Sequence, residues 1–574
     1  MKVNKIWLAA TIFCLSVALL MHLPFFGQLP KGLNRDEAAL GYTAYSLLKT
    51  GKDEWGKSWP ISILSFGDQK LPGYVYTLIP FIKFLGLTNQ AIRLPSLLSG
   101  LTIIISMGIL SLLLAKSFKW STQKQLIFST LTMLFLAISP WEMHFSRVAY
   151  EAHLALSYFL VGLVGYLLAI EAVKKTKYQG WLILLTTTAW SVCLLTYHSY
   201  QLFLPMFALG LLIIDWRKLK KLPPLTMLSM VVVGSITLWL LWAGGIFQAN
   251  LVKNRGITPL SSDHLLSQAT GYRSALPLPG IVNKLLFNKA TEGSVVLAQN
   301  YLSSFSLGFL FAHGSNHGDH NPGNINNLNL FIAPLLILGF LGLKEFKSHH
   351  QIKRLFLWFV LALVPSALTN SPLHEVRELA IFPLLELIAA FGFTWGLFKF
   401  VGPKWRLWTI CGLIIIMVLS GLRTFITYIY LVPPQAVNNQ KYILLARALA
   451  KYQQVGLEVI TQSPSSSPYV WYLIENKTDP SWVQDNLVHF PPTSEGFIHV
   501  RKLGNITFET INLGEIYQQI DIKPVIVILR PEEMAFEQSI DKRWTSLEKI
   551  FDDQGKLVYE VWEVAPEDKK ITIN

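Results

Sequence analysis

The chain has 574 residues, of which 52% are hydrophobic and only 15% are charged. This composition is too apolar for a soluble domain, and many apolar runs reach the roughly 20 residues that cross a bilayer. The net charge of +14 does not indicate a nucleic-acid partner, because Lys and Arg gather in short loops between apolar runs. The sequence therefore predicts a mainly α-helical polytopic membrane protein.

About eleven apolar segments are predicted to cross the membrane. In chain order they are 6–26, 92–114, 125–140, 154–172, 181–197, 201–214, 225–247, 328–343, 355–369, 379–398 and 407–430. Lys2 and Lys5 precede the first segment as in a signal peptide, but no small-x-small cleavage site follows, so we interpret it as an uncleaved helix. Residues 74–86 are apolar but short, which favours an interfacial or re-entrant helix.

Basic clusters alternate with polar clusters along the chain. Lys and Arg precede the first span and follow the second, fourth, sixth, eighth and tenth, which places these loops in the cytoplasm. The extracytoplasmic side then receives 27–91, 139–153, 197–200, 248–326, 370–378 and everything after about 431. Every cluster of residues that could take part in catalysis or binding falls on that side. Cys14, Cys193 and Cys411 lie in apolar runs and predict neither a disulfide framework nor a metal pair.

The composition changes near residue 436. Short buried strands are predicted at apolar runs such as GLEVITQS, PVIVILR and LVYEVWEV. Residues 440–454 are predicted to form an amphipathic helix. We therefore expect a transmembrane domain over 1–435 and a small soluble α/β domain over 436–574 on the extracytoplasmic side.

Asp36 and Glu37 form an acidic pair just after the first span. One interpretation is a helix start, with Asp36 as the cap and Glu37 in the first turn. The other is functional, because a carboxylate at the membrane boundary can act as a general base or bind a divalent cation. Lys70 lies where the chain returns to the interface, and its ammonium suits a lipid phosphate, although simple snorkelling also explains it.

Two further clusters carry candidate residues. In Ser139–His153, Arg147 can grip a phosphate or pair with Glu151 on one helix face. In 374–378, Arg377 is a second phosphate anchor, or the acids there support a helix start. The loop 313–321, HGSNHGDHN, holds three histidines and an aspartate that can bind a metal, but its spacing matches no standard zinc pattern and a polar glycine-rich loop is the simpler explanation.

The order of these motifs resembles a known family. The residues are Asp36-Glu37, Lys70-Leu71-Pro72, Arg93-Leu94-Pro95, the segment SP…FSRxAYExH, and the HxxR…P helix start formed by His374, Arg377 and Pro383. Over residues 1 to about 430 the chain resembles the GT-C glycosyltransferases of the superfamily of dolichyl-phosphate-mannose–protein mannosyltransferases and lipid A aminoarabinose transferase. Its bacterial branch called RgtA/B/C/D-like is the most similar.

The resemblance implies an inverting glycosyltransferase with a polyprenyl-phosphate-linked sugar donor and a lipid, glycan or protein acceptor on the extracytoplasmic face. It implies Asp36 as the catalytic carboxylate supported by Glu37, and Lys70 near the donor phosphate. The remaining substrate-binding candidates are Arg147, Glu151, His374 and Arg377. No cofactor is implied, and a divalent metal remains an alternative.

Two other classes of function stay open. A transporter or flippase for a lipid-linked glycan predicts charges inside the spans and inverted repeats, and the sequence shows few such charges and no obvious repeat. An assembly protein that recruits glycan-building enzymes predicts that Asp36 is dispensable. A comparison of sugar transfer by the wild type and the Asp36→Asn variant distinguishes these two functions from that of a glycosyltransferase.

Overall fold

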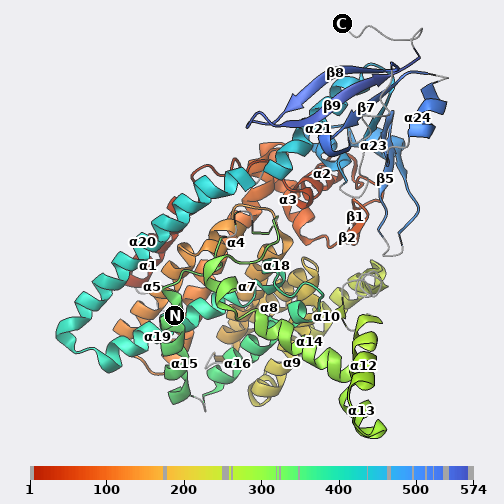
Figure 1. The fold of residues 1–574 in the computed structure, drawn as a ribbon. Coiled ribbons are helices and arrows are strands. Elements are labelled where there is room, and N and C mark those ends of the chain that lie inside the picture. The colour runs from red at the N-terminus through yellow and green to blue at the C-terminus, as the bar shows by residue number, and fades with distance from the viewer. Residues whose placement is uncertain are drawn as a thin grey trace. The chain divides into compact units, whose positions relative to one another are not determined.

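Figure 1 shows the fold of the chain in a computed structural model. The structure describes residues 5–171, 177–248, 258–259, 263–318, 320–321, 323, 325–346, 349–435, 437–461, 467–493, 497–510, 513–520, 523–533 and 542–566. Contacts divide the chain into two compact units. The helical unit comprises Met1–Leu29 and Arg93–Gln435, and the sheet unit comprises Pro30–Ile92 and Ala436–Asn574.

The helical unit is built almost entirely from helices. They are α1 (Lys5–His22), α4 (Asn89–Ser117), α5 (Thr122–Ala137), α6 (Pro140–Phe145), α7 (Glu151–Glu171), α8 (Lys177–Leu194), α9 (His198–Leu219), α10 (Pro224–Ala243), α12 (Asp263–Ala275), α13 (Gly280–Leu286), α14 (Lys289–Ser303), the π-helix η2 (Gly308–Ala312), α15 (Ile332–Leu343), the 3-10 helix η3 (Lys344–Phe346), α16 (His350–Ala362), α17 (Val364–Ala367), α18 (Glu375–Glu378), α19 (Phe382–Phe400) and α20 (Pro403–Gln435).

Helix α19 forms the centre of this unit. The most apolar stretch of α19 is 83% buried, whereas those of α10 and α20 are 17% and 22% buried and present their apolar side chains outwards. Helices α15 and α19 approach closely at Gly339 and Gly392, since a Cβ on Gly392 would lie 2.3 Å from the Gly339 nitrogen. Small residues of this kind let membrane helices pack backbone to backbone.

The helices bear out the predicted class of polytopic helical membrane protein. Within the described part of the chain, seven helices are long and apolar enough to cross a membrane, and all but one coincide with a predicted span. The other predicted spans coincide with α5, α8, α9, α15 and α16. The number of eleven stays a prediction.

The segment 248–326 lies outside every predicted span, yet part of it is helical. It contains α12, α13 and α14, and the stretch Gly280–Ala312 is apolar enough to cross a membrane. Asn288 starts α14 with a capping box, in which its side chain accepts the Thr291 N–H and Thr291 accepts the Asn288 N–H. Such caps satisfy two of the free amides at a helix start and thereby support the helix.

The sheet unit contains the predicted α/β region. Its helices are α2 (Arg35–Thr50), α3 (Gly73–Leu85), α21 (Val437–Gln453), α22 (Tyr469–Glu475), α23 (Pro480–Asn486) and α24 (Leu513–Ile520), and its strands are β1 (Ile63–Ser65), β2 (Asp68–Lys70), β3 (Glu458–Thr461), β4 (Leu487–His489), β5 (Val500–Leu503), β6 (Ile506–Phe508), β7 (Val525–Leu529), β8 (Trp544–Phe551) and β9 (Leu557–Val564). The predicted strands correspond to β3, β7 and β9, and the predicted amphipathic helix to α21.

Among the described residues, the C-terminal strands form one sheet in the order β4-β5-β6-β3-β7-β9-β8. Strand β3 pairs in parallel with β6 and β7, and the outer pairs are antiparallel. Figure 1 shows β8 and β9 as long neighbouring arrows. Strand β7 is buried along its whole length, as expected for a central strand covered on both faces.

The segment 30–92 packs with the C-terminal residues. The Tyr42 hydroxyl donates to the Thr478 carbonyl at 2.9 Å, and the Trp471 indole donates to the Leu33 carbonyl at 2.8 Å. A Cβ on Gly41 would lie 3.2 Å from the Ile474 side chain, so α2 and α22 meet closely. The division into domains 1–435 and 436–574 stays a prediction, and in the structure the region around Asp36 is built against the second of them.

Candidate active site

Helix α2 begins with a capping box that employs Glu37. The Asn34 Oδ1 accepts the Glu37 N–H at 2.8 Å, and the Glu37 Oε2 accepts the Asn34 N–H at 3.1 Å. The two bonds satisfy the backbone N–H groups of Asn34 and Glu37 at the helix start. The cap residue is Asn34 rather than Asp36, and Glu37 is 1% exposed. The carboxylate of Asp36 is left outside the cap, with its side chain 26% exposed.

A short hairpin positions Lys70. Strands β1 and β2 pair in antiparallel fashion around the turn Phe66-Gly67, and both turn residues have positive φ, at 39° and 81°. Such two-residue turns match the twist of a hairpin. A Cβ on Gly67 would lie 2.1 Å from the Ile498 carbonyl oxygen, so only glycine fits there. Lys70 is the last residue of β2.

The structure brings Asp36 and Lys70 together. The Lys70 Nζ lies 2.5 Å from the Asp36 Oδ1, and the Lys70 side chain is 9% exposed. The same ammonium lies 5.1 Å from the centre of the Phe66 ring, and the Arg35 guanidinium lies over that ring at 4.4 Å. An ammonium has three N–H donors, so Lys70 can bind a phosphate oxygen while it still contacts Asp36.

Two residues without any sequence signal hold the hairpin in place. The Tyr469 hydroxyl accepts the Phe66 N–H at 3.0 Å and donates to the Glu54 Oε1 at 2.9 Å. The Trp55 indole donates to the same oxygen at 3.1 Å. Burial of Glu54 raises the pKa of its carboxyl to about 7. Tyr469 lies in the C-terminal region and Glu54 in a loop, so no local pattern links them to Lys70.

Arg147 is fully buried and engaged with backbone. Its guanidinium donates to the carbonyls of His22 at 3.1 Å and Pro24 at 2.5 Å, and lies 5.2 Å from the Tyr428 ring. The His22 carbonyl ends α1 and the Pro24 carbonyl lies just beyond it, where the helix itself supplies no donor. The contacts give Arg147 a structural explanation, while its predicted role in phosphate binding stays a prediction. Glu151 is the first residue of α7 and is 8% exposed.

His374 and Arg377 lie around the short helix α18. The Arg377 Nη1 donates to the Thr369 hydroxyl at 2.8 Å. His374 is buried, and the centre of its ring lies 4.3 Å from that of His320. The neighbouring Glu375 accepts hydrogen bonds from the Ser315 N–H at 2.6 Å and from the Ser315 hydroxyl at 2.5 Å. The structure therefore joins the loop 313–321 to the start of α18.

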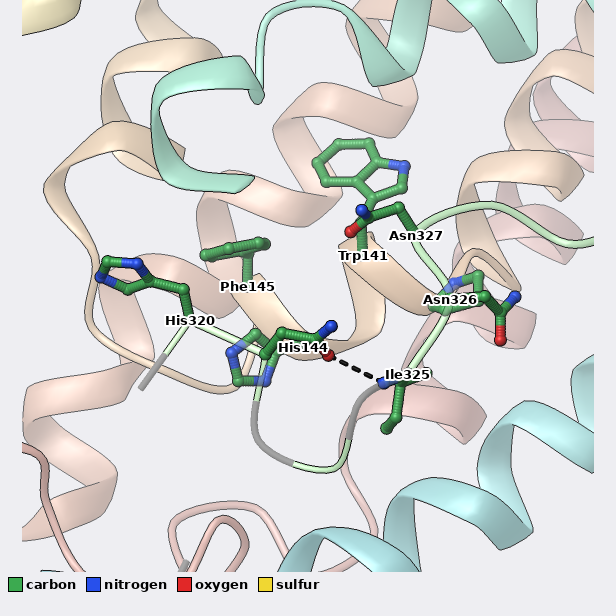
Figure 2. Close-up of a pocket in the computed structure, with 9 residues that line it drawn as sticks. Trp141, His144, Phe145, His320, Ile325, Asn326 and Asn327 are labelled. Carbon is green, nitrogen blue, oxygen red and sulfur yellow. Dashed lines mark hydrogen bonds between the residues drawn. The ribbon is translucent and has the colours of Figure 1, made fainter. Parts of the chain in front are cut away.

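Figure 2 shows a pocket next to this contact. It is lined by Pro140, Trp141, His144, Phe145, His320, Asn321, Ile325, Asn326 and Asn327. The dashed line marks the bond that the Ile325 N–H donates to Asn321. The pocket has a volume of about 10 Å³, which is close to that of a single water site. A sugar phosphate therefore does not fit in it.

The predicted site residues therefore divide between the two units. Asp36, Glu37 and Lys70 lie together in the sheet unit. The other candidates, Arg147, Glu151, His374 and Arg377, belong to the helical unit. Of these four, Arg147 and Arg377 use their guanidinium groups in hydrogen bonds within that unit.

No protein-family model matches the chain, and no curated protein sequence matches it. Among solved structures, ArnT from Cupriavidus metallidurans bound to undecaprenyl phosphate aligns over 98% of this chain and 99% of its own, with a TM-score of 0.53 and 12% identity. The chain therefore shares the fold of this ArnT structure, and a fold of this kind is what the resemblance to the GT-C glycosyltransferases predicted.

Two further similar structures have lower scores. The oligosaccharyltransferase AglB from Archaeoglobus fulgidus covers 99% of this chain and 75% of its own, with a TM-score of 0.46 and 11% identity. The mycobacterial arabinofuranosyltransferase AftD covers 99% of this chain and 42% of its own, with a TM-score of 0.46 and 13% identity.

Proposed function

We propose that the chain is an inverting glycosyltransferase that transfers a hexose or pentose from a polyprenyl-phosphate donor to a lipid, glycan or protein acceptor. The observation that carries the proposal is the Asp36–Lys70 pair, with 2.5 Å between the Lys70 Nζ and the Asp36 Oδ1. The fold supports it, because the similar ArnT structure was solved with bound undecaprenyl phosphate. A carboxylate and a cation are the two groups that this transfer needs.

The proposed reaction is a single displacement. The Asp36 carboxylate takes the proton of the acceptor hydroxyl or amine, and the acceptor atom forms a bond to the anomeric carbon of the sugar. The bond from that carbon to the phosphate oxygen breaks, and its electron pair leaves with the polyprenyl phosphate. Lys70 stabilises the growing negative charge on this phosphate. Attack opposite the leaving group inverts the anomeric carbon, and the chain itself supplies both groups, so the step requires no cofactor.

Asp36 is a better base than Glu37 on structural grounds. The Glu37 Oε2 accepts the Asn34 N–H and the residue is 1% exposed, whereas a quarter of the Asp36 side chain is open to solvent. Only Asp36 can therefore meet an incoming acceptor without the loss of a helix cap.

Arg377 and His374 are proposed as further contacts to substrate, together with Arg147 and Glu151.

The test is sugar transfer in membranes from a panel of radiolabelled polyprenyl-phosphate hexoses and pentoses. A general base contributes about 10²–10⁴-fold to the rate, so Asp36→Asn should lower transfer by about that factor. Glu37→Gln is the matched control, because glutamine also completes a capping box and should leave transfer near the wild-type rate. Wild-type transfer by Asp36→Asn would refute the assignment of Asp36.

The proposal also places the sheet unit on the extracytoplasmic side of the membrane. The basis is the alternation of basic loops in the sequence. A Ser481→Cys variant in a Cys411→Ser background should react with an impermeant thiol reagent in intact cells, because Ser481 is exposed in α23. Lys116→Cys, at the exposed end of α4, should be protected. The reverse pattern of labelling would contradict this orientation.

A further inference from the structure

Three histidine rings meet beside α18. Two come from one turn of the loop after η2, where His317 accepts backbone hydrogen bonds from the His320 N–H at 3.0 Å and the Asn321 N–H at 2.9 Å. This turn stacks the rings of His317 and His320, with 3.9 Å between their centres and 9° between their planes. The turn therefore presents two imidazoles in the same direction.

The third ring comes from a distant part of the sequence. The ring centre of His374 lies 4.3 Å from that of His320 and 5.3 Å from that of His317. The bonds from Ser315 to Glu375 fix this approach, because Ser315 precedes the turn and Glu375 follows His374 directly. The Asn321 amide also donates to the His313 carbonyl at 2.7 Å and braces the loop. These hydrogen bonds of Ser315, Glu375 and Asn321 hold the loop against the start of α18 without relying on contacts between the rings.

The ring nitrogens are close enough to share one ion. One ring nitrogen from each of the three histidines lies within 4.8 Å of the other two. Zn–N bonds of about 2.0–2.1 Å in tetrahedral geometry require nitrogen separations of about 3.3 Å. To bind one ion, the ring nitrogens must therefore move closer together by up to roughly 1.5 Å. The exposed side chain of His317 can rotate to bring its nitrogen closer.

Two ring nitrogens of this cluster lack a partner. The Nδ1 atoms of His320 and His374 are buried and have no hydrogen-bond partner in the described parts of the chain. Buried polar atoms without a partner are rare, and a bound ion would satisfy them.

We propose that His317, His320 and His374 bind one divalent transition-metal ion, with Zn²⁺ as the expected occupant. Imidazole ligands suit zinc and its first-row neighbours and not Mg²⁺ or Ca²⁺, which prefer oxygen. Three protein ligands leave a fourth position for water or an anion. The nearby Arg377 opposes a cation, so tight binding needs all three rings. The ion joins the loop 313–321 to the start of α18, and its binding can be measured separately from sugar transfer.

The test is zinc binding to the full-length protein, purified in detergent with a tag that contains no histidine and stripped with a chelator. Competition with a chromophoric chelator should give one Zn²⁺ per chain for the wild type. His317→Ala and His374→Gln should weaken the affinity by more than the ~10–100-fold that loss of an outer-shell partner costs. His313→Gln is the matched control, because the His313 ring bonds the Gly314 carbonyl and lies outside the triad.

A second measurement follows thermal unfolding with and without Zn²⁺. Zinc should raise the unfolding midpoint of the wild type and of His313→Gln, because a ligand that binds only the native state stabilises it. It should leave the midpoint of His317→Ala unchanged, and this variant should fold normally because His317 is exposed. Equal zinc affinity in the wild type and His317→Ala, or no binding by the wild type, would overturn the proposal.

Discussion

Lys70 Nζ contacts Asp36 Oδ1 at 2.5 Å although the two residues are 34 positions apart in the chain. Asp36 stands in the first turn of α2, and Lys70 ends the second strand of a hairpin whose turn requires Gly67. The carboxylate and the ammonium therefore depend on different elements, both of which pack with the C-terminal residues. This dependence leads to predictions for residues inside and outside the pair.

Replacement of Lys70 tests the cation. Lys70→Gln keeps a polar side chain but removes the charge that stabilises the departing phosphate, so kcat should fall by about 10²–10³-fold. Lys70→Arg should retain part of the rate, because its charge remains while its planar fork replaces a compact ammonium. Steady-state kinetics with the polyprenyl-phosphate donor measure both. A fully active Lys70→Gln enzyme would remove Lys70 from the mechanism.

Replacement of Tyr469 tests the support of the hairpin. Tyr469→Phe loses the bonds to the Phe66 N–H and the Glu54 Oε1, so Lys70 should be less well positioned. A misplacement of about 1 Å can cost as much as 10²-fold in rate, and we expect a decrease of roughly ten- to hundredfold in kcat. Tyr472→Phe in the same helix is the control, because its hydroxyl donates to Gln453 instead. Equal rates in both variants would show that the hairpin needs no such support.

Glu54 should make stability depend on pH. Its pKa is raised from 4.5 to about 7, chiefly by burial. A carboxyl whose pKa is higher in the folded than in the unfolded protein favours folding below the unfolded value, and this contribution is lost as the pH rises through the folded value. The free energy of unfolding should therefore fall between pH 4.5 and about 7, by an amount on the order of a few kcal/mol. Thermal unfolding from pH 5 to 8 measures the trend.

The matched variant for this measurement is Glu54→Gln. Glutamine cannot ionise, but it can still accept the hydrogen bonds of Tyr469 and Trp55 through its amide oxygen. The variant should lose most of the pH dependence between pH 5 and 8 and be the more stable protein at pH 8. The same slope in wild type and variant would assign the pH dependence to another group.

Replacement of Arg147 should mainly lower the free energy of unfolding and should affect donor binding less. Arg147→Gln leaves the carbonyls of His22 and Pro24 without their donor, and the loss of hydrogen bonds from a charged group should cost about 3 kcal/mol of unfolding free energy. The exposed Arg447, with 68% of its side chain accessible, is the control, and Arg447→Gln should change stability by less than ~0.5 kcal/mol. A raised KM for the donor with unchanged stability would instead support the predicted phosphate contact.

The sequence by itself determined the class of fold. Apolar length and the alternation of basic loops are local properties, so they indicated the membrane helices, and runs of β-branched residues indicated β3, β7 and β9. The acidic start of α2 was also visible, although the cap proved to be Asn34 rather than Asp36. No span was predicted within 248–326, where the structure contains α12, α13 and α14.

Only the tertiary structure decided which residues meet. Tyr469 supports a hairpin more than 400 positions earlier in the chain, Arg147 binds carbonyls at and just beyond the end of α1, and His374 joins the histidines of the loop after η2. The loop 313–321 by itself matches no zinc motif, and the third member of the proposed triad, His374, comes from another element. Contacts of this kind depend on how helices and strands pack, and packing brings together residues whose distance in the sequence carries no information about it.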